Sequence, residues 1–93
     1  MNISGATLTK RSRYAVINVD SGGVLSVNNP VTGRVFVLND VGRRVLELSD
    51  GATPFSDIVN RVCTEFYGAQ REQVQEEIEE FLKACNGAQL IEY

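Results

Sequence analysis

Ninety-three residues, 43% of them hydrophobic, are enough for one domain with a single modest core. Residues 1–34 carry four basic groups and one acidic group (net +3), which leaves five basic and eleven acidic groups (net −6) in residues 35–93. This acidic balance argues against general binding of a phosphate backbone, which needs clustered Lys and Arg.

The chain has few of the residue types that catalysis and metal binding usually need. Histidine is absent, so the commonest general base and metal ligand is missing, and Cys63 and Cys85 form neither a zinc motif nor a disulfide framework. No signal peptide and no apolar run of membrane-spanning length is present. We therefore expect a cytoplasmic, non-enzymatic protein that needs no metal and no cofactor and has no membrane contact.

The first half of the chain has a hydrophobic period of about two, which predicts strands. Tyr14–Val19, Val24–Asn28 and Arg34–Leu38 are the three expected strands, and residues 20–23 and 29–33 between them are rich in turn-forming types. Alternation along the third strand places Phe36 and Leu38 on one face.

From residue 39 the period changes to about 3.6, which predicts helices. Asn39 is a good N-cap for a first helix that ends at residues 49–51. A second helix is expected to open with Thr53 as N-cap and Pro54 at its first position, and to end at Gly68.

The third expected helix runs from Gln70 to Asn86, where apolar residues recur at three-and-four spacing. A final apolar pair, Leu90 and Ile91, is expected to pack back on the core. The sequence thus predicts an α+β, winged-helix-like fold, in which a three-stranded antiparallel sheet is followed by three helices.

The third strand, Arg34–Leu38, is expected to form an edge of that sheet. It is apolar at four of its five positions, and no proline, lysine or bulge protects it from pairing with another chain. Two interpretations stay open at this point: the edge is covered by a helix, or it is kept open for a partner.

A winged-helix DNA-binding or scaffold protein is one alternative for this pattern of elements. The third helix, however, carries five acidic and two basic side chains, and the acidic run at 76–80 is most simply a solvated face. Phosphate would repel such a helix, so we expect no binding to nucleic acid.

Particular residues point to a family. The third strand and its surroundings read Thr32-Gly33-x-Val35-Phe36-x-Leu38-Asn39, and the next helix ends in Asp50-Gly51. From about Tyr14 to Ile91 the sequence resembles the coenzyme PQQ synthesis protein D family, the recognition elements of ribosomally made, post-translationally modified peptides (RiPPs). Residues 13–93 would form this domain, and residues 1–12 would be disordered or fold over the sheet.

The resemblance implies that a precursor leader peptide adds as an antiparallel strand beside the third strand and lies against the third helix. The expected contacts are Arg34, Val35, Phe36, Val37 and Leu38 on the strand and Gln75, Ile78, Glu79 and Leu82 on the helix. For Val35 and Val37 an alternative is packing under the N-terminal segment. The implied partner is a RiPP-modifying enzyme, either a radical-SAM maturase or a leader peptidase, and a homodimer formed through the open edge is an additional expectation.

Overall fold

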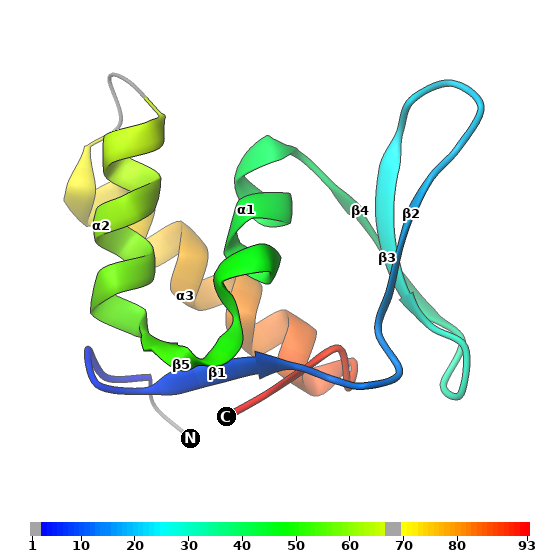
Figure 1. Ribbon diagram of the computed structural model, residues 1–93, viewed down its shortest axis with the longest axis horizontal. Coiled ribbons are helices and arrows are strands. Elements are labelled where there is room, and N and C mark those ends of the chain that lie inside the picture. Colours follow the sequence, from blue (N-terminus) through cyan, green and yellow to red (C-terminus); the bar gives the residue numbers. More distant parts are fainter. Residues whose placement is uncertain (1–2, 67–69) are drawn as a thin grey trace.

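The computed structural model of the protein describes residues 3–66 and 70–93. Three helices and two separate three-stranded sheets make up this part of the chain, which confirms the expected α+β class (Figure 1). In chain order the elements are β1 (Leu8–Arg11), β2 (Val16–Val19), β3 (Leu25–Asn29), β4 (Arg34–Leu38), α1 (Asp40–Leu48), β5 (Asp50–Pro54), α2 (Phe55–Glu65), α3 (Arg71–Gly87) and β6 (Ile91–Glu92).

Strands β2, β3 and β4 form the antiparallel meander that the alternating pattern predicts. In the first turn the Asp20 N–H donates to the Val24 carbonyl (3.0 Å), and Gly23 has a φ of 82°. Glycine in the left-handed region is typical of such three-residue hairpin loops. Because backbone groups alternate sides along an antiparallel strand, the even-numbered residues of β3 direct their N–H and C=O groups toward β2, and the odd-numbered ones toward β4.

The second sheet, in the order β5-β1-β6, was not predicted. Its central strand β1 is antiparallel to both neighbours, and Thr9 within it is fully buried. The N-terminal segment from Ile3 onward is therefore part of the folded domain, and it does not fold over the β2–β4 sheet. Figure 1 shows β1 and β5 running beneath the helices, with the β2–β4 sheet at the right.

Helix α1 begins as expected, because the Asn39 side chain accepts a hydrogen bond from the Gly42 N–H (2.7 Å). The prediction for the start of the next helix was wrong. Pro54 is still extended (φ −63°, ψ 151°), α2 begins at Phe55, and the Thr53 hydroxyl donates to Asp50 instead of capping the helix. Gly68, the expected end of this helix, lies outside the described residues.

The core lies between the helices and the inner face of the β2–β4 sheet. Every helix contributes one buried stripe, and the expected apolar pair near the C-terminus, Leu90 and Ile91, is buried with them. Arg44 on α1 holds Glu65 on α2 through two hydrogen bonds of 2.6 and 2.9 Å. No described helix is long and apolar enough to cross a membrane.

Candidate functional site

Strand β4 is an edge of its sheet, and the register settles which of its backbone groups face outward. Val27 of β3 lies opposite Phe36 of β4, and as an odd-numbered residue of β3 it directs its backbone toward β4. The N–H and C=O of Phe36 therefore point into the sheet. Those of Val35 and Val37 point away from it, where another strand could pair with them.

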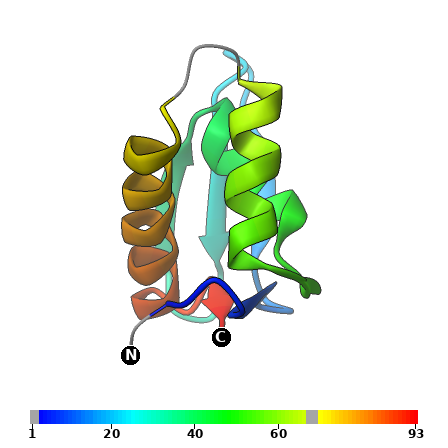
Figure 2. The same cartoon turned by 90° about the vertical axis from the view of Figure 1, so that its left-hand side faces the viewer.

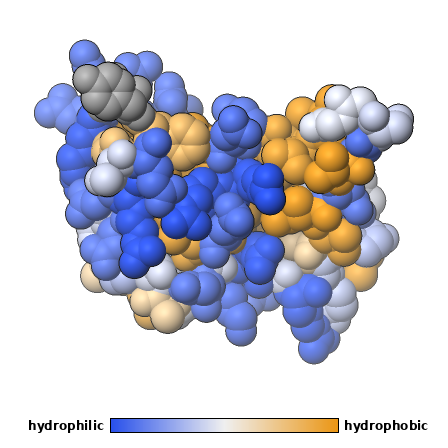
Figure 3. All heavy atoms as spheres, turned by 45° about the horizontal axis from the view of Figure 1, so that its top comes forward, coloured by the Kyte–Doolittle hydropathy of each residue, from blue (hydrophilic) through white to orange (hydrophobic). Residues whose placement is uncertain are grey.

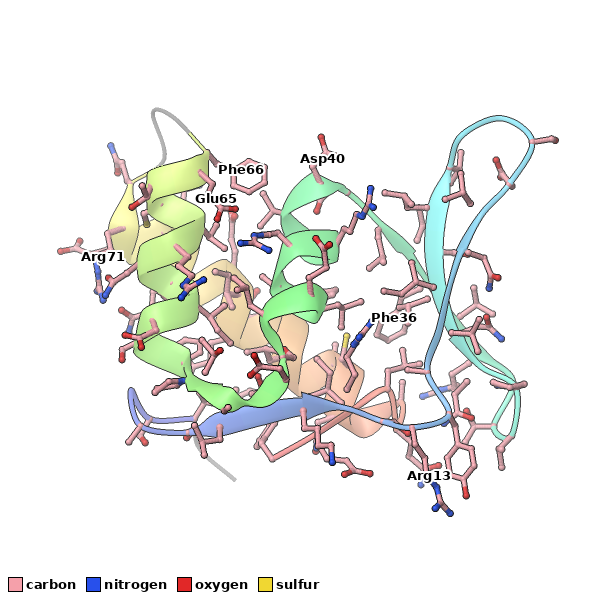
Figure 4. All side chains as sticks on the ribbon, in the orientation of Figure 1. Arg13, Phe36, Asp40, Glu65, Phe66 and Arg71 are labelled. Atoms are coloured by element: carbon pink, nitrogen blue, oxygen red, sulfur yellow. The ribbon has the colours of Figure 1, made fainter. Side chains whose placement is uncertain are left out.

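The side chains of β4 divide between the two faces of the sheet as alternation predicts. Leu38 is buried and Phe36 is half-buried against the core, while Val35 and Val37 on the outer face are 59% and 75% exposed. Neither valine packs under the N-terminal segment. Figure 4 shows the Phe36 ring pointing from β4 toward the helices.

Helix α3 lies on the same side of the molecule as β4. In Figure 2, β4 stands behind α3, whereas β2 stands behind α2, on the other side of the sheet. Gly42 of α1 lies between α3 and the end of β4: a Cβ atom at this glycine would lie 3.4 Å from Leu38 Cδ2 and 3.5 Å from Phe81 Cζ. Phe81 of α3 and the last residue of β4 thus lie on either side of a position that has no side chain.

A cleft of about 140 Å³ opens beside Gly42. Its lining is largely apolar, with one carboxylate, and comes from the start of α1 and from one flank of α3: Asn39, Val41, Gly42, Val45, Glu77, Ile78 and Phe81. Together with the inner face of β4, this cleft forms what we call the β4–α3 groove. Figure 3 shows that apolar side chains gather over the β2–β4 sheet, while polar ones cover most of the helical part on that face.

Of the five strand residues of the predicted site, Arg34, Phe36 and Leu38 share the inner face of β4, and Val35 and Val37 lie on its outer face. The four helix residues are also divided. Ile78 and Leu82 are fully buried in the core, and of these Ile78 reaches the cleft. Gln75 and Glu79 lie on the opposite flank of α3, where Gln75 accepts a bond from Arg71 and Glu79 pairs with Lys83 (3.8 Å). The groove therefore does not include Gln75 and Glu79.

Two residues that line the cleft, Phe81 and Glu77, were not among the predicted site residues, although their helical spacing places them beside the buried stripe of α3. At 100° per residue, Phe81 and Glu77 lie on one side of the buried stripe through Ile78, and Glu79 lies on the other side. Only the position of α1 decides which of these flanks meets β4. A helical projection of the sequence could have shown that the groove residues of α3 lie on one of the two flanks of its buried stripe, but not which flank.

The groove is acidic on its helix side. Glu77 accepts a hydrogen bond from Gln73 (3.3 Å), and neither ion pair found in residues 3–66 and 70–93 involves Glu77. Both basic residues of α3, Arg71 and Lys83, make their polar contacts away from the groove. A bound segment would thus meet an uncompensated carboxylate at this end of the groove.

Neither cysteine lines the cleft. Burial raises the pKa of the Cys85 thiol to about 12, so this cysteine stays protonated in the core. In the part of the chain that the structure describes, no three His, Cys, Asp or Glu side chains come together in a way that could hold a metal ion.

Solved structures with the same fold are known. TbiB1 in complex with the TbiA(beta) leader peptide has a TM-score of 0.72 and 28% identity, over 89% of this chain and 94% of that one. Lasso peptide synthetase B1 complexed with its leader peptide gives 0.72 and 16%, over 94% and 100%. A PqqD truncation of Methylobacterium extorquens PqqCD, a stand-alone RiPP recognition element, gives 0.75 and 23%, over 98% and 95%.

No curated protein sequence matches the chain closely enough to count as a relative. The family model for coenzyme PQQ synthesis protein D, in contrast, matches residues 14–91, which include every strand of the meander and all three helices. The chain therefore belongs to the coenzyme PQQ synthesis protein D family.

Proposed function

We propose that the protein binds the leader segment of a ribosomally made precursor peptide as an extra antiparallel strand on β4. The observation that carries this proposal is the open β4 edge, where the backbone groups of Val35 and Val37 point outward beside the β4–α3 groove. Leader peptides are bound to TbiB1 and to lasso peptide synthetase B1, two proteins of the same fold, which supports this choice of ligand.

The two parts of the site would have different roles. Main-chain hydrogen bonds to Val35 and Val37 give affinity for any extended peptide, and side-chain pockets give specificity. In a strand paired with β4, every second side chain would enter the groove between Phe36 and Phe81. The others would lie on the outer face beside the exposed side chains of Val35 and Val37.

Binding without chemistry is the activity that fits such a site. A captured leader would hold the precursor near a modifying enzyme, a radical-SAM maturase or a leader peptidase, in the cytoplasm where the precursor is made. DNA binding is the weaker proposal, because the exposed face of α3 is mostly acidic and would be repelled by phosphate.

Proline substitutions test the strand pairing, because proline removes one backbone N–H. Val35→Pro and Val37→Pro each remove an outward N–H and should leave the domain folded. Loss of one main-chain bond is worth about 0.5–1.5 kcal/mol, so each variant should bind roughly two- to tenfold more weakly. Phe36→Pro removes an inward N–H and should unfold the sheet.

The measurement is titration calorimetry with a peptide selected for binding to the wild-type domain from a displayed library of random 12-residue peptides, with circular dichroism to check folding. Ser21→Pro, in the exposed β2–β3 turn, is the control, because it places a proline in the same sheet but off the β4 edge and the Ser21 N–H makes no hydrogen bond among the described residues. Unchanged affinity in both folded variants, Val35→Pro and Val37→Pro, would show that the peptide docks elsewhere.

A further inference from the structure

One end of the β4–α3 groove carries a cation. Arg34 is the first residue of β4, and alternation places its side chain on the same face as Phe36 and Leu38. The residue is exposed, and the ion pairs found among the described residues do not include it. A peptide strand on β4 would therefore pass a basic group where β4 begins.

The other end carries an anion. Glu77 lines the cleft that follows Leu38 and accepts a bond only from the neutral Gln73 among the described residues. Between the two charges the groove presents two aromatic rings, Phe36 from β4 and Phe81 from α3. The order along β4 is thus cation, apolar centre, anion.

Strand geometry converts this order into a spacing. Cross-strand neighbours lie about 4.5–5.5 Å apart, and their side chains share one face. When one peptide residue lies opposite Phe36, the peptide residues two positions away on either side lie opposite Arg34 and opposite Leu38. Leu38 lies beside Gly42, and Phe81 lies on the other side of that glycine. A long basic side chain at the last of these positions can lay its aliphatic stem on Leu38 and extend its charge to Glu77.

We propose that the peptide recognised at this groove has the pattern Lys/Arg, any residue, large apolar, any residue, Asp/Glu, and that its charge order sets its direction along β4. This inference rests on the proposed strand addition. In an antiparallel strand the basic residue comes first and lies near Glu77, and the acidic residue comes last and lies near Arg34. The reversed order would place like charges together at both ends.

The expected preference is modest, because exposed ion pairs in water are weak. A peptide with the proposed charge order gains two attractions, one to Arg34 and one to Glu77, whereas a peptide with the reversed order meets two repulsions. The affinity of the first should therefore exceed that of the second by roughly 4- to 30-fold. The preference should shrink at about 1 M salt, where the screening length is about 3 Å.

The test is a selection from a displayed library of random 12-residue peptides, carried out with the wild-type protein and with Arg34→Glu/Glu77→Lys. Wild type should enrich the basic–apolar–acidic order, and the charge-swapped variant should enrich acidic–apolar–basic. The matched control, Arg61→Glu/Glu79→Lys, makes the same two charge changes on α2 and on the opposite flank of α3, and should select as wild type does.

Each result has a distinct meaning. Selected peptides that bind Val37→Pro more weakly than wild type use the β4 edge. If such peptides show no preferred charge order, or the same order in wild type and in the charge-swapped variant, the proposed charge pattern is wrong and strand addition stands. Enrichment of the acidic-first order by wild type would overturn the proposed direction. No enrichment at all, or peptides insensitive to Val37→Pro, would overturn strand addition and with it this inference.

Discussion

The two sheets of this protein differ in how the chain makes them and in what they leave open. The β2–β4 sheet is a local meander, joined by two short turns, and both of its outer strands are edges. The β5-β1-β6 sheet, which we call the closing sheet, joins the beginning, middle and end of the chain. The β2–β4 sheet, which we call the open sheet, instead exposes large apolar side chains on its edge strand β4.

Burial follows the same division. Thr9 of β1 and Ile91 of β6 are almost completely inaccessible, whereas Val35 and Val37 of β4 are among the most exposed large apolar residues described. Exposed apolar edges favour aggregation, so proteins usually protect them. The contrast indicates that β4 is kept open for a use, and that the stability needed for this comes from elsewhere in the domain.

The largest expected effect comes from breaking the closing sheet. Thr9 is fully buried in the central strand β1, and its hydroxyl donates to Ser49 Oγ. Thr9→Pro removes this buried bond and places a proline ring in a central strand, so it should abolish cooperative folding at 25 °C. Val37→Pro, the matched substitution in the open edge, should retain a cooperative melt. Thermal unfolding followed by circular dichroism separates the two, and a folded Thr9→Pro variant would contradict the assigned roles.

A smaller effect is expected at the hydroxyl chain that joins β1 to α1. The Thr9 hydroxyl donates to Ser49 Oγ (3.0 Å), which in turn donates to the Val45 carbonyl (2.8 Å). Ser49→Ala leaves the buried Thr9 hydroxyl without its acceptor, so unfolding free energy should fall by about 1–3 kcal/mol.

Urea unfolding measures this loss, and Ser26→Ala in the open sheet is the matched control. Ser26 is half-buried and makes no side-chain hydrogen bond with other described residues, so its replacement should cost about 0.5 kcal/mol or less. Equal losses in both variants would mean that the hydroxyl chain adds no stability of its own.

The smallest effect is expected away from both sheets, at the ion pair between α1 and α2. The hydrogen bonds from Arg44 lower the pKa of the Glu65 carboxyl below its usual value. A carboxyl with a lowered folded-state pKa stabilises the fold above its unfolded pKa and loses this contribution as the pH falls through the folded value.

Glu65→Gln should therefore melt slightly lower than wild type at pH 7, and the two should converge below about pH 3. The side chains of Arg44 and Glu65 are 31% and 39% exposed, so high salt should also reduce the difference. Melting curves at pH 7 and pH 3 check this, and a gap that widens in acid would contradict the assigned role of the pair.

The open sheet and the helices could be predicted from the sequence because their signals are local. Alternation over Arg34–Leu38, the Asn39 cap and the apolar stripe of α3 all appear within a few neighbouring residues. The closing sheet could not be predicted, because β1 reads Leu-Thr-Lys-Arg and β5 reads Asp-Gly-Ala-Thr-Pro. β1 looks like a polar segment and β5 like a turn, and only pairing with distant residues makes them strands.

The candidate site divides in the same way. The strand residues follow from edge position and alternation, both readable locally. The helix residues depend on which flank of α3 meets β4, and that is decided by the packing of α1, through Gly42 and Phe81. Gln75 and Glu79 lie on the flank of α3 that does not line the cleft, and the pattern of a single helix carries no information about which flank packs beside α1 and β4.

The pairing of β1 with β6 makes the domain easy to attach to other proteins. Figure 1 shows β1 and the C-terminus beneath the helices, with the β2–β4 sheet at the right. A polypeptide fused before β1 or after β6 would leave the molecule from one sheet while the edge of the other stays accessible. A flexible tether at either place would hold the fused partner at an effective concentration in the millimolar range, so that even a weakly held peptide would be retained near it.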